Sequence, residues 1–406
     1  MISPQLKSPE AGVFLRRPVP IDAYRVFFPI GWLMGLAGVG LWILFLQNAM
    51  GTYPKEWHAD LMTGGFLPLF AAGFLMTAVP RFTGSFGPER SDFVVGGALA
   101  AGLLLTVFFP NRLPFHACLG AFSLFLLAFC WRRIRNRSAY PPPPLILALA
   151  ALAAEVVAAA FQAFHDATGR ADLFDTLGRL YLYEGFQLLL ILGVGIFLIP
   201  NLLGRPTCTP PVTVSVRPPK EKPLPFLRLI PLPLWVVSAV LLASFALEIR
   251  VSPALGRGLR AAVFTLVSFH DWKIHRGPAV RSTLAWSLWT SCWLLLLGLW
   301  LPVAAPSYDV HARHLAYVGG FGLMTFAVAT RVTLAHGSHD LVLEKTSRLL
   351  KAAVGLILLA AATRSIARLL PETAYWNHLL FAAWSWTLGL AAWGGFALPR
   401  IFKTGD

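Results

Sequence analysis

Hydrophobic residues in this chain are gathered in long runs that short polar connections separate. Each run is about 20 residues long, which is the length that an α-helix needs to cross the hydrocarbon core of a bilayer. The pattern predicts twelve membrane-spanning helices, at 26–48, 58–80, 93–110, 114–131, 144–165, 178–203, 229–248, 253–270, 282–302, 310–334, 349–370 and 376–399. The predicted fold class is therefore an all-α polytopic membrane protein.

The eighth run is the least regular, because Arg257 and Arg260 interrupt it. With twelve crossings and a cytoplasmic N-terminus, the cytoplasmic segments carry 24 of the 34 Lys and Arg residues, as the positive-inside rule expects. Leaving the eighth run out would put basic later connections on the other side. We therefore expect one membrane domain at 26–399, with a cytoplasmic N-terminal segment at 1–25 and a cytoplasmic tail at 400–406.

An internal similarity links the second, sixth and tenth predicted spans, which share the pairs Gly65-Phe66, Gly185-Phe186 and Gly320-Phe321. The first two of these spans also match at Gly73 with Gly193, Pro80 with Pro200 and Gly84 with Gly204. Each separation corresponds to four helices, so the pattern indicates three repeated four-helix units whose small residues allow close helix packing. Chance agreement of glycines in apolar sequence is the alternative.

Charge and cysteine usage exclude several classes of protein. A net charge of +15 is compatible with nucleic-acid binding, but the basic residues lie in short connections, where they set membrane orientation. We therefore expect no nucleic-acid partner, and a lipid bilayer instead. The cysteines form no CxxC or CxxCH pattern, which argues against covalent haem attachment, a zinc ribbon or a disulfide framework; they are Cys118, Cys130, Cys208 and Cys292.

The histidines are divided between the two faces of the predicted membrane. His58, His116, His165, His311, His314 and His378 lie at the outer face, and His270, His275, His336 and His339 at the inner face. His58 and His314 begin two of the repeat-related spans at the same depth. Two neutral imidazoles at equal depth on facing helices can hold a haem iron, so we predict that His58 and His314 are haem ligands. The alternative for each outer histidine is an interfacial residue near the lipid headgroups.

Other polar residues near this level are candidates for chemistry. His311 lies one helical turn from His314, and it is open whether it binds a second metal, bonds a haem propionate or faces water. Carboxylates within a membrane are costly and therefore often functional, which applies to Glu155 and Glu184. Glu184 and its neighbour Tyr181 are the candidate catalytic residues, for proton relay or cation binding. A protonated acid that bonds between helices is the alternative.

At these residues the chain resembles the NnrS family, bacterial inner-membrane proteins that are associated with the response to nitric oxide and described as binding haem and copper. The resemblance rests on Trp57-His58-Ala59, Met62, Gly65-Phe66, Gly73-Phe74-Leu75 and Thr77-Ala78-Val79-Pro80, and on His314, Val318-Gly319, Met324, Val328, Thr330-Arg331 and His336-Gly337. It implies an inner-membrane location, His58 and His314 as haem or metal ligands, and His336 as a further metal-site histidine.

The chain departs from the family pattern at three places. Where the family reads His-Ala-His-Glu-Met, this chain has His58-Ala59-Asp60-Leu61-Met62 and so lacks the second histidine and the glutamate. Ile196-Phe197 and Ser338-His339 stand where the family has Gly-Arg and Thr-Gly. Since possible ligands are lost, a non-covalent b-type haem is the expected cofactor, and copper is left open.

The resemblance implies a haem protein that binds, senses or turns over nitric oxide during nitrosative stress, and whether it is an enzyme stays open. A secondary transporter is an alternative, since Glu155 and Glu184 and the prolines within the spans suit that class. A redox subunit that exchanges electrons with quinol is another. A transporter would be purified without pigment, whereas quinol would reduce the haem of a redox subunit.

Overall fold

The computed structural model describes residues 21–205 and 226–403. Within these two ranges every regular element is a helix, and eleven helices are long and apolar enough to cross a membrane. The prediction of an all-α polytopic membrane protein is therefore confirmed. Residues 1–20 of the predicted N-terminal segment, Cys208 and residues 404–406 of the predicted tail lie outside the described residues.

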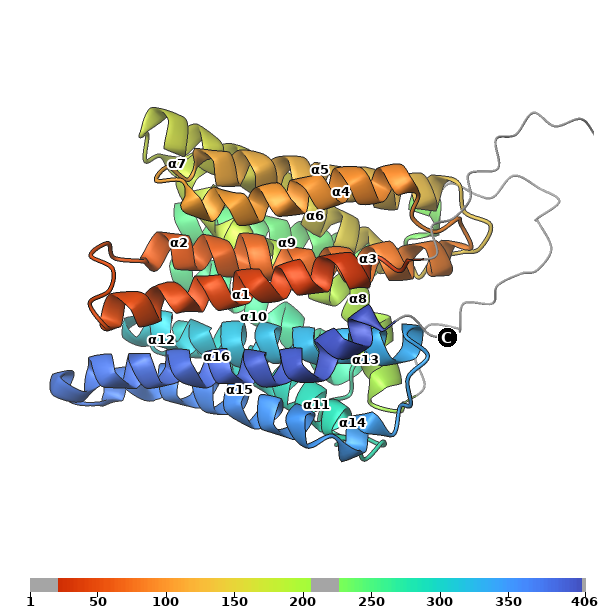
Figure 1. Ribbon diagram of the computed structural model, residues 1–406. Coiled ribbons are helices and arrows are strands. Elements are labelled where there is room, and N and C mark those ends of the chain that lie inside the picture. Colours follow the sequence, from red (N-terminus) through yellow and green to blue (C-terminus); the bar gives the residue numbers. More distant parts are fainter. Residues whose placement is uncertain (1–20, 206–225, 404–406) are drawn as a thin grey trace, which may run out of the picture.

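The helices follow one another in three groups, each with four helices of membrane-spanning length (Figure 1). The first group comprises α1 (Tyr24–Leu46), α2 (Lys55–Asp60) continuing through η1 (Leu61–Phe66) into α3 (Leu67–Thr83), α4 (Arg90–Leu105) with η2 (Thr106–Phe108), and α5 (Leu113–Arg135). The second comprises α6 (Leu145–Thr168), α7 (Leu173–Leu180) continuing through η3 (Tyr181–Gly185) into α8 (Phe186–Leu202), α9 (Leu232–Arg250) after η4 (Phe226–Leu229), and α10 (Pro253–His270). The third comprises α11 (Thr283–Ala304), η5 (Pro306–Tyr308) and α12 (Asp309–His314) continuing through η6 (Leu315–Gly322) into α13 (Leu323–His336), α15 (Arg348–Ile366) with η7 (Ala367–Leu369) after α14 (Leu343–Thr346), and α16 (Glu372–Phe402).

Helix α10 is the predicted eighth span, and it has the predicted bounds but is not one of the eleven apolar helices. It lies alongside the other long helices and contacts α9 and α11. Its 18 residues extend about 27 Å at 1.5 Å per residue. The arginines that interrupt its apolar run bind Glu248 of α9. The charges of α10 are thus paired with a carboxylate of the neighbouring helix. Helix α10 is the fourth long helix of its group, as α5 and α16 are of theirs.

A π-helical segment interrupts the second membrane helix of every group. These segments are η1, η3 and η6, and each one ends at or contains the glycine of a Gly-Phe pair. π-Helical turns are rare and are concentrated at functional sites. Their recurrence at three matched positions supports a threefold structural repeat, as the sequence pattern indicated.

The ends of α3 and α8 are also alike. Gly84 and Gly204 follow these helices with φ angles of +58° and +75°, the left-handed conformation that favours glycine at a helix end. In both turns the next residue donates its N–H to the carbonyl of a proline within the helix, from Ser85 to Pro80 at 2.9 Å and from Arg205 to Pro200 at 2.8 Å. The matched prolines and glycines therefore build the same helix ending twice.

The three groups are arranged in a closed ring. Helix α5 packs on α6, α10 packs on α11, and α16 packs back on α1. The three helices that contain π segments are the most buried. In their apolar 18-residue stretches, 83%, 72% and 72% of the residues are buried, against at most 67% for the other candidate spans. They therefore form the centre of the bundle. Their N-terminal parts, α2, α7 and α12, lie at one end of it (Figure 1), which we call the His58 end.

Candidate functional site

A large cavity opens between the first and third groups at the His58 end. Its volume is about 480 Å³, which is within the range of pockets that hold small ligands and cofactors. Its walls come from α1, α2 with η1, η3, α12 with η6, α15 and α16. We call it the histidine cavity, because His58 and His314 both line it.

The hydrogen bonds of the two imidazoles fix which nitrogen is free. The Nδ1 of His58 donates to the carbonyl of Gly38 at 2.9 Å, and the Nδ1 of His314 donates to the carbonyl of Val310 at 2.6 Å. Since a carbonyl oxygen can only accept, the proton of each neutral ring is on Nδ1. The Nε2 atoms therefore keep their lone pairs, and metal-ligating histidines are commonly oriented by this kind of bond.

Cationic and aromatic side chains complete the walls. Arg364 and Lys55 line the cavity, and no carboxylate of the described residues forms an ion pair with either of them. Trp42, Phe66 and Trp386 supply broad apolar surfaces. Haem is a flat apolar ring that carries two carboxylates, so two free imidazole nitrogens, two cations and aromatic walls fit a haem. Within 21–205 and 226–403, no group of three or more His, Cys, Asp or Glu side chains is arranged to hold a metal ion.

Two further histidines were expected at a metal site. His311 is buried beside this cavity but does not line it, and its Nδ1 lies 2.8 Å from a guanidinium nitrogen of Arg364. His336 ends the same membrane helix 22 residues beyond His314, where its Nε2 lies 2.9 Å from a guanidinium nitrogen of Arg81. The structure therefore brings His311 close to the histidine cavity through Arg364 and keeps His336 at the opposite end of the bundle.

Asp60, two residues after His58, is turned away from the histidine cavity. Its carboxylate is fully buried and lies 3.1 Å from Arg112 and 3.5 Å from His116. His116 in turn contacts Asp166 at 2.6 Å. Helix α2 thus presents His58 to the cavity and Asp60 to a buried charge cluster on its other side.

Glu184 belongs to a second charge cluster at the His58 end. It forms ion pairs with Arg313 and with Arg260, the latter at 3.4 Å. The whole cluster has three cations and three anions, so its formal charges balance; the members are Arg257, Arg260, Arg313, Glu184, Glu248 and Asp309. The hydroxyl of Tyr317 lies 3.5 Å from Glu184, and Tyr317 lines the histidine cavity. Glu184 is therefore linked to that cavity by one side chain.

The remaining candidates face other helices. Tyr181 donates to the carbonyl of Leu242 at 3.0 Å and packs on Phe245, and it does not line the histidine cavity. Glu155 is fully buried and accepts a hydrogen bond from Ser123 at 2.7 Å. Neither residue shares a site with the two cavity histidines.

Sequence reasoning missed several residues of this cavity. Arg364 had a detectable signal, because a charged residue within a predicted span deserves the attention given to Glu184. Tyr183, Tyr317 and Trp386 also line the cavity, but tyrosine and tryptophan are frequent near span ends. Nothing in the local sequence separates these aromatic residues from others of the same type.

The family comparison covers nearly the whole chain. The family described as NnrS protein matches residues 21–403. A comparison with curated proteins gave no match.

Proposed function

This chain belongs to the NnrS family, and we propose that it is a membrane haem protein that binds nitric oxide at the histidine cavity. Family membership makes it a membrane protein related to the nitric oxide response. We further propose that its cofactor is a non-covalent b-type haem and that the ligands are His58 and His314. The protein would lie in the bacterial inner membrane, with both termini in the cytoplasm.

One observation carries the proposal. His58 and His314 come from two different groups of helices, line the same cavity and each have a free Nε2. Histidines that only anchor a helix at the lipid headgroups would not be expected to line one common cavity. The cavity is also large enough for a cofactor and contains cations suited to its carboxylates.

Each group of residues then has a defined task. The imidazoles of His58 and His314 hold the metal, while Arg364 and Lys55 bind and orient the carboxylates of the ring. Trp42, Phe66 and Trp386 exclude water from its apolar faces. A bound haem would supply an iron able to take up a diatomic ligand in place of one of the two imidazoles. Tyr317 with Glu184 is the polar pair next to this cavity, so we propose these residues for any proton transfer there.

Optical spectroscopy of the purified protein tests the proposal. We expect a coloured protein whose pyridine haemochrome identifies haem b, and a reduced absorption spectrum that shifts when nitric oxide is added. A colourless, iron-free preparation from haem-replete cells would refute the haem and favour a transporter. A haem spectrum that nitric oxide leaves unchanged would refute nitric oxide binding and favour an electron carrier.

A further inference from the structure

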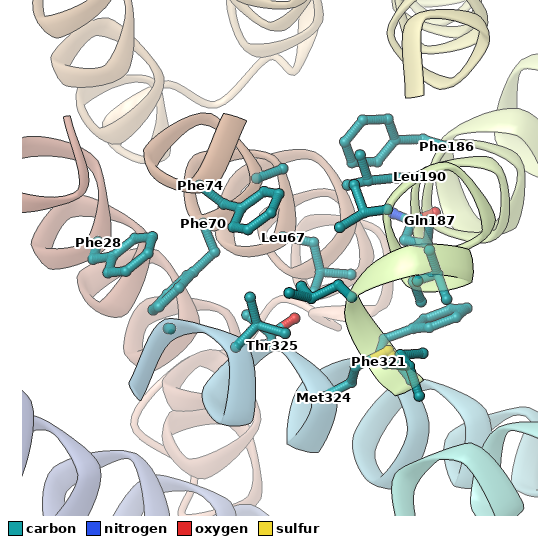
Figure 2. Close-up of a pocket in the computed structure, with 18 residues that line it drawn as sticks. Phe28, Leu67, Phe70, Phe74, Phe186, Gln187, Leu190, Phe321, Met324 and Thr325 are labelled. Carbon is teal, nitrogen blue, oxygen red and sulfur yellow. The ribbon is translucent and has the colours of Figure 1, made fainter. Parts of the chain in front are cut away.

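A second, smaller cavity lies at the centre of the bundle. Its volume is about 100 Å³, and its walls are mainly formed by α3, α8 and α13, which continue from the three π segments (Figure 2). Of the 18 lining residues, all are apolar except Gln187 and Thr325. We call it the central cavity.

The central cavity has room for a small guest. Protein interiors are packed to crystal density, with few voids larger than one water molecule. An apolar cavity of about 150 Å³ stays dry and binds benzene or xenon. About 100 Å³ is too small for a quinol ring with its tail but large enough for a diatomic gas. The size of the cavity therefore selects small ligands.

Gln187 pairs its amide nitrogen with the backbone of two π segments, whereas its amide oxygen has no partner among the described residues. The amide nitrogen of Gln187 donates to the carbonyl of Thr63 in η1 at 3.2 Å and to the carbonyl of Leu182 in η3 at 3.1 Å. Its oxygen is buried and accepts no hydrogen bond from the described residues. Among the residues that the structure describes, no charged side chain lines the cavity. An ion would lose its hydration without compensation there, whereas an apolar gas would not.

The central cavity and the histidine cavity share a wall. Leu67 lines both of them, and the preceding residue, Phe66, lines the histidine cavity. Gln187 lines the central cavity and bonds to Thr63, which lines the other. The side chain of Leu67 and the hydrogen bond from Gln187 to Thr63 are therefore part of the wall between the two cavities.

We propose that the central cavity is a docking site for an apolar diatomic gas, nitric oxide in this protein, from which the gas passes Leu67 into the histidine cavity. This inference rests on the proposed function for the identity of the gas. It gives the three π-bearing helices a common role, which is to line a ligand-docking site next to the cofactor site.

Ligand recombination after flash photolysis of the reduced carbon monoxide complex tests the route. Ala329→Phe on α13 and Ala71→Phe on α3 place a ring in the central cavity from two walls, so each should slow bimolecular recombination severalfold. Leu67→Ala removes the shared wall and should accelerate it. The matched control is Ala335→Phe, because Ala335 is on the same helix as Ala329 but is exposed and lines neither cavity.

Xenon tests the cavity without using the haem. Crystals of the unmodified protein under xenon pressure should show an anomalous peak between α3, α8 and α13, and Ala329→Phe should abolish it. Haem-containing variants that all recombine at the unmodified rate would overturn the inference and leave the proposed function standing. A haem-free protein that still binds xenon would overturn the proposed function, and with it the assignment of the gas, but not the docking site.

Discussion

His58 and His314 reach the histidine cavity from the first and the third group of helices, and each ring is oriented by a main-chain carbonyl of the α1 or α12 helix. Neither imidazole depends on the other for its orientation. Removal of one ring should therefore leave the second in place, which makes the two ligands separable by mutation.

Replacement of either ring should change the haem spectrum. In His58→Ala and His314→Ala the iron would lose one axial nitrogen, so we expect a shift from a low-spin to a high-spin spectrum and a lower haem content. Added imidazole should restore the low-spin spectrum, because each substitution opens space beside the iron. His378→Ala is the control, since His378 is near a span end and does not line the cavity. An unchanged spectrum in both ligand variants would refute the assignment.

Arg364→Leu should weaken haem binding. A hydrogen bond to a charged group contributes about 1.5–3 kcal/mol, so we expect the haem dissociation constant to rise about ten- to a hundredfold. Competition with apomyoglobin measures this constant. Arg368→Leu provides the comparison, because Arg368 is near Arg364 in sequence but is exposed and outside the cavity. Equal haem loss from both variants would mean that Arg364 has no direct contact with the haem.

Glu184→Ala should destabilise the fold. Removing one partner of a buried ion pair costs about 3–5 kcal/mol, because it leaves an uncompensated charge. Thermal unfolding in detergent should therefore show a large loss, partly reversed when Arg313→Leu is added. Asp22→Ala removes the partially exposed pair of Asp22 with Arg81, which is worth about 0.2–1 kcal/mol. If the Glu184→Ala variant is as stable as the Asp22→Ala variant, the Glu184 carboxylate is not needed for stability.

Alanine substitutions at four glycines should distinguish the effect of close helix packing from the effect of helix propensity. A Cβ atom at Gly193 would lie 2.4 Å from the backbone nitrogen of Ala148, and one at Gly298 would lie 2.4 Å from that of Ala316. Alanine at either position should lower the melting temperature, because overpacking costs about 1–3 kcal/mol. A Cβ atom at Gly97 or Gly355 would meet no described residue of another helix within 4 Å, so alanine there should be neutral or stabilising by up to about 1 kcal/mol. The same response at all four glycines would exclude close packing as the cause.

The helices could be predicted from sequence because membrane thickness sets the length of each apolar run. Even α10 was found with the correct bounds, although its arginines need a partner that only the structure identifies, Glu248. The matched glycines predicted a repeat, since a left-handed turn or a close helix approach requires this residue in each copy.

The composition of the cavity could be predicted only in part. His58 and His314 were identifiable because two histidines begin related spans. Tyr181 was a predicted candidate, but it is Tyr183 that lines the cavity. Both lie in η3, and a π-helical turn rotates the following side chains away from the α-helical phase. Sequence periodicity does not detect such a segment, so it cannot tell which tyrosine faces inward.

Two junctions of the ring are joined by a connecting segment of the chain, whereas the junction between α16 and α1 is not. Side-chain hydrogen bonds connect α1 to α16 at this junction: Arg25 donates to the carbonyl of Ile401 at 2.6 Å, and Trp32 donates to the carbonyl of Leu390 at 2.8 Å. The histidine cavity lies at this same junction, with Trp42 and Trp386 on its two sides. A cofactor bound there would hold the first helix to the last, so holoprotein should resist unfolding better than apoprotein.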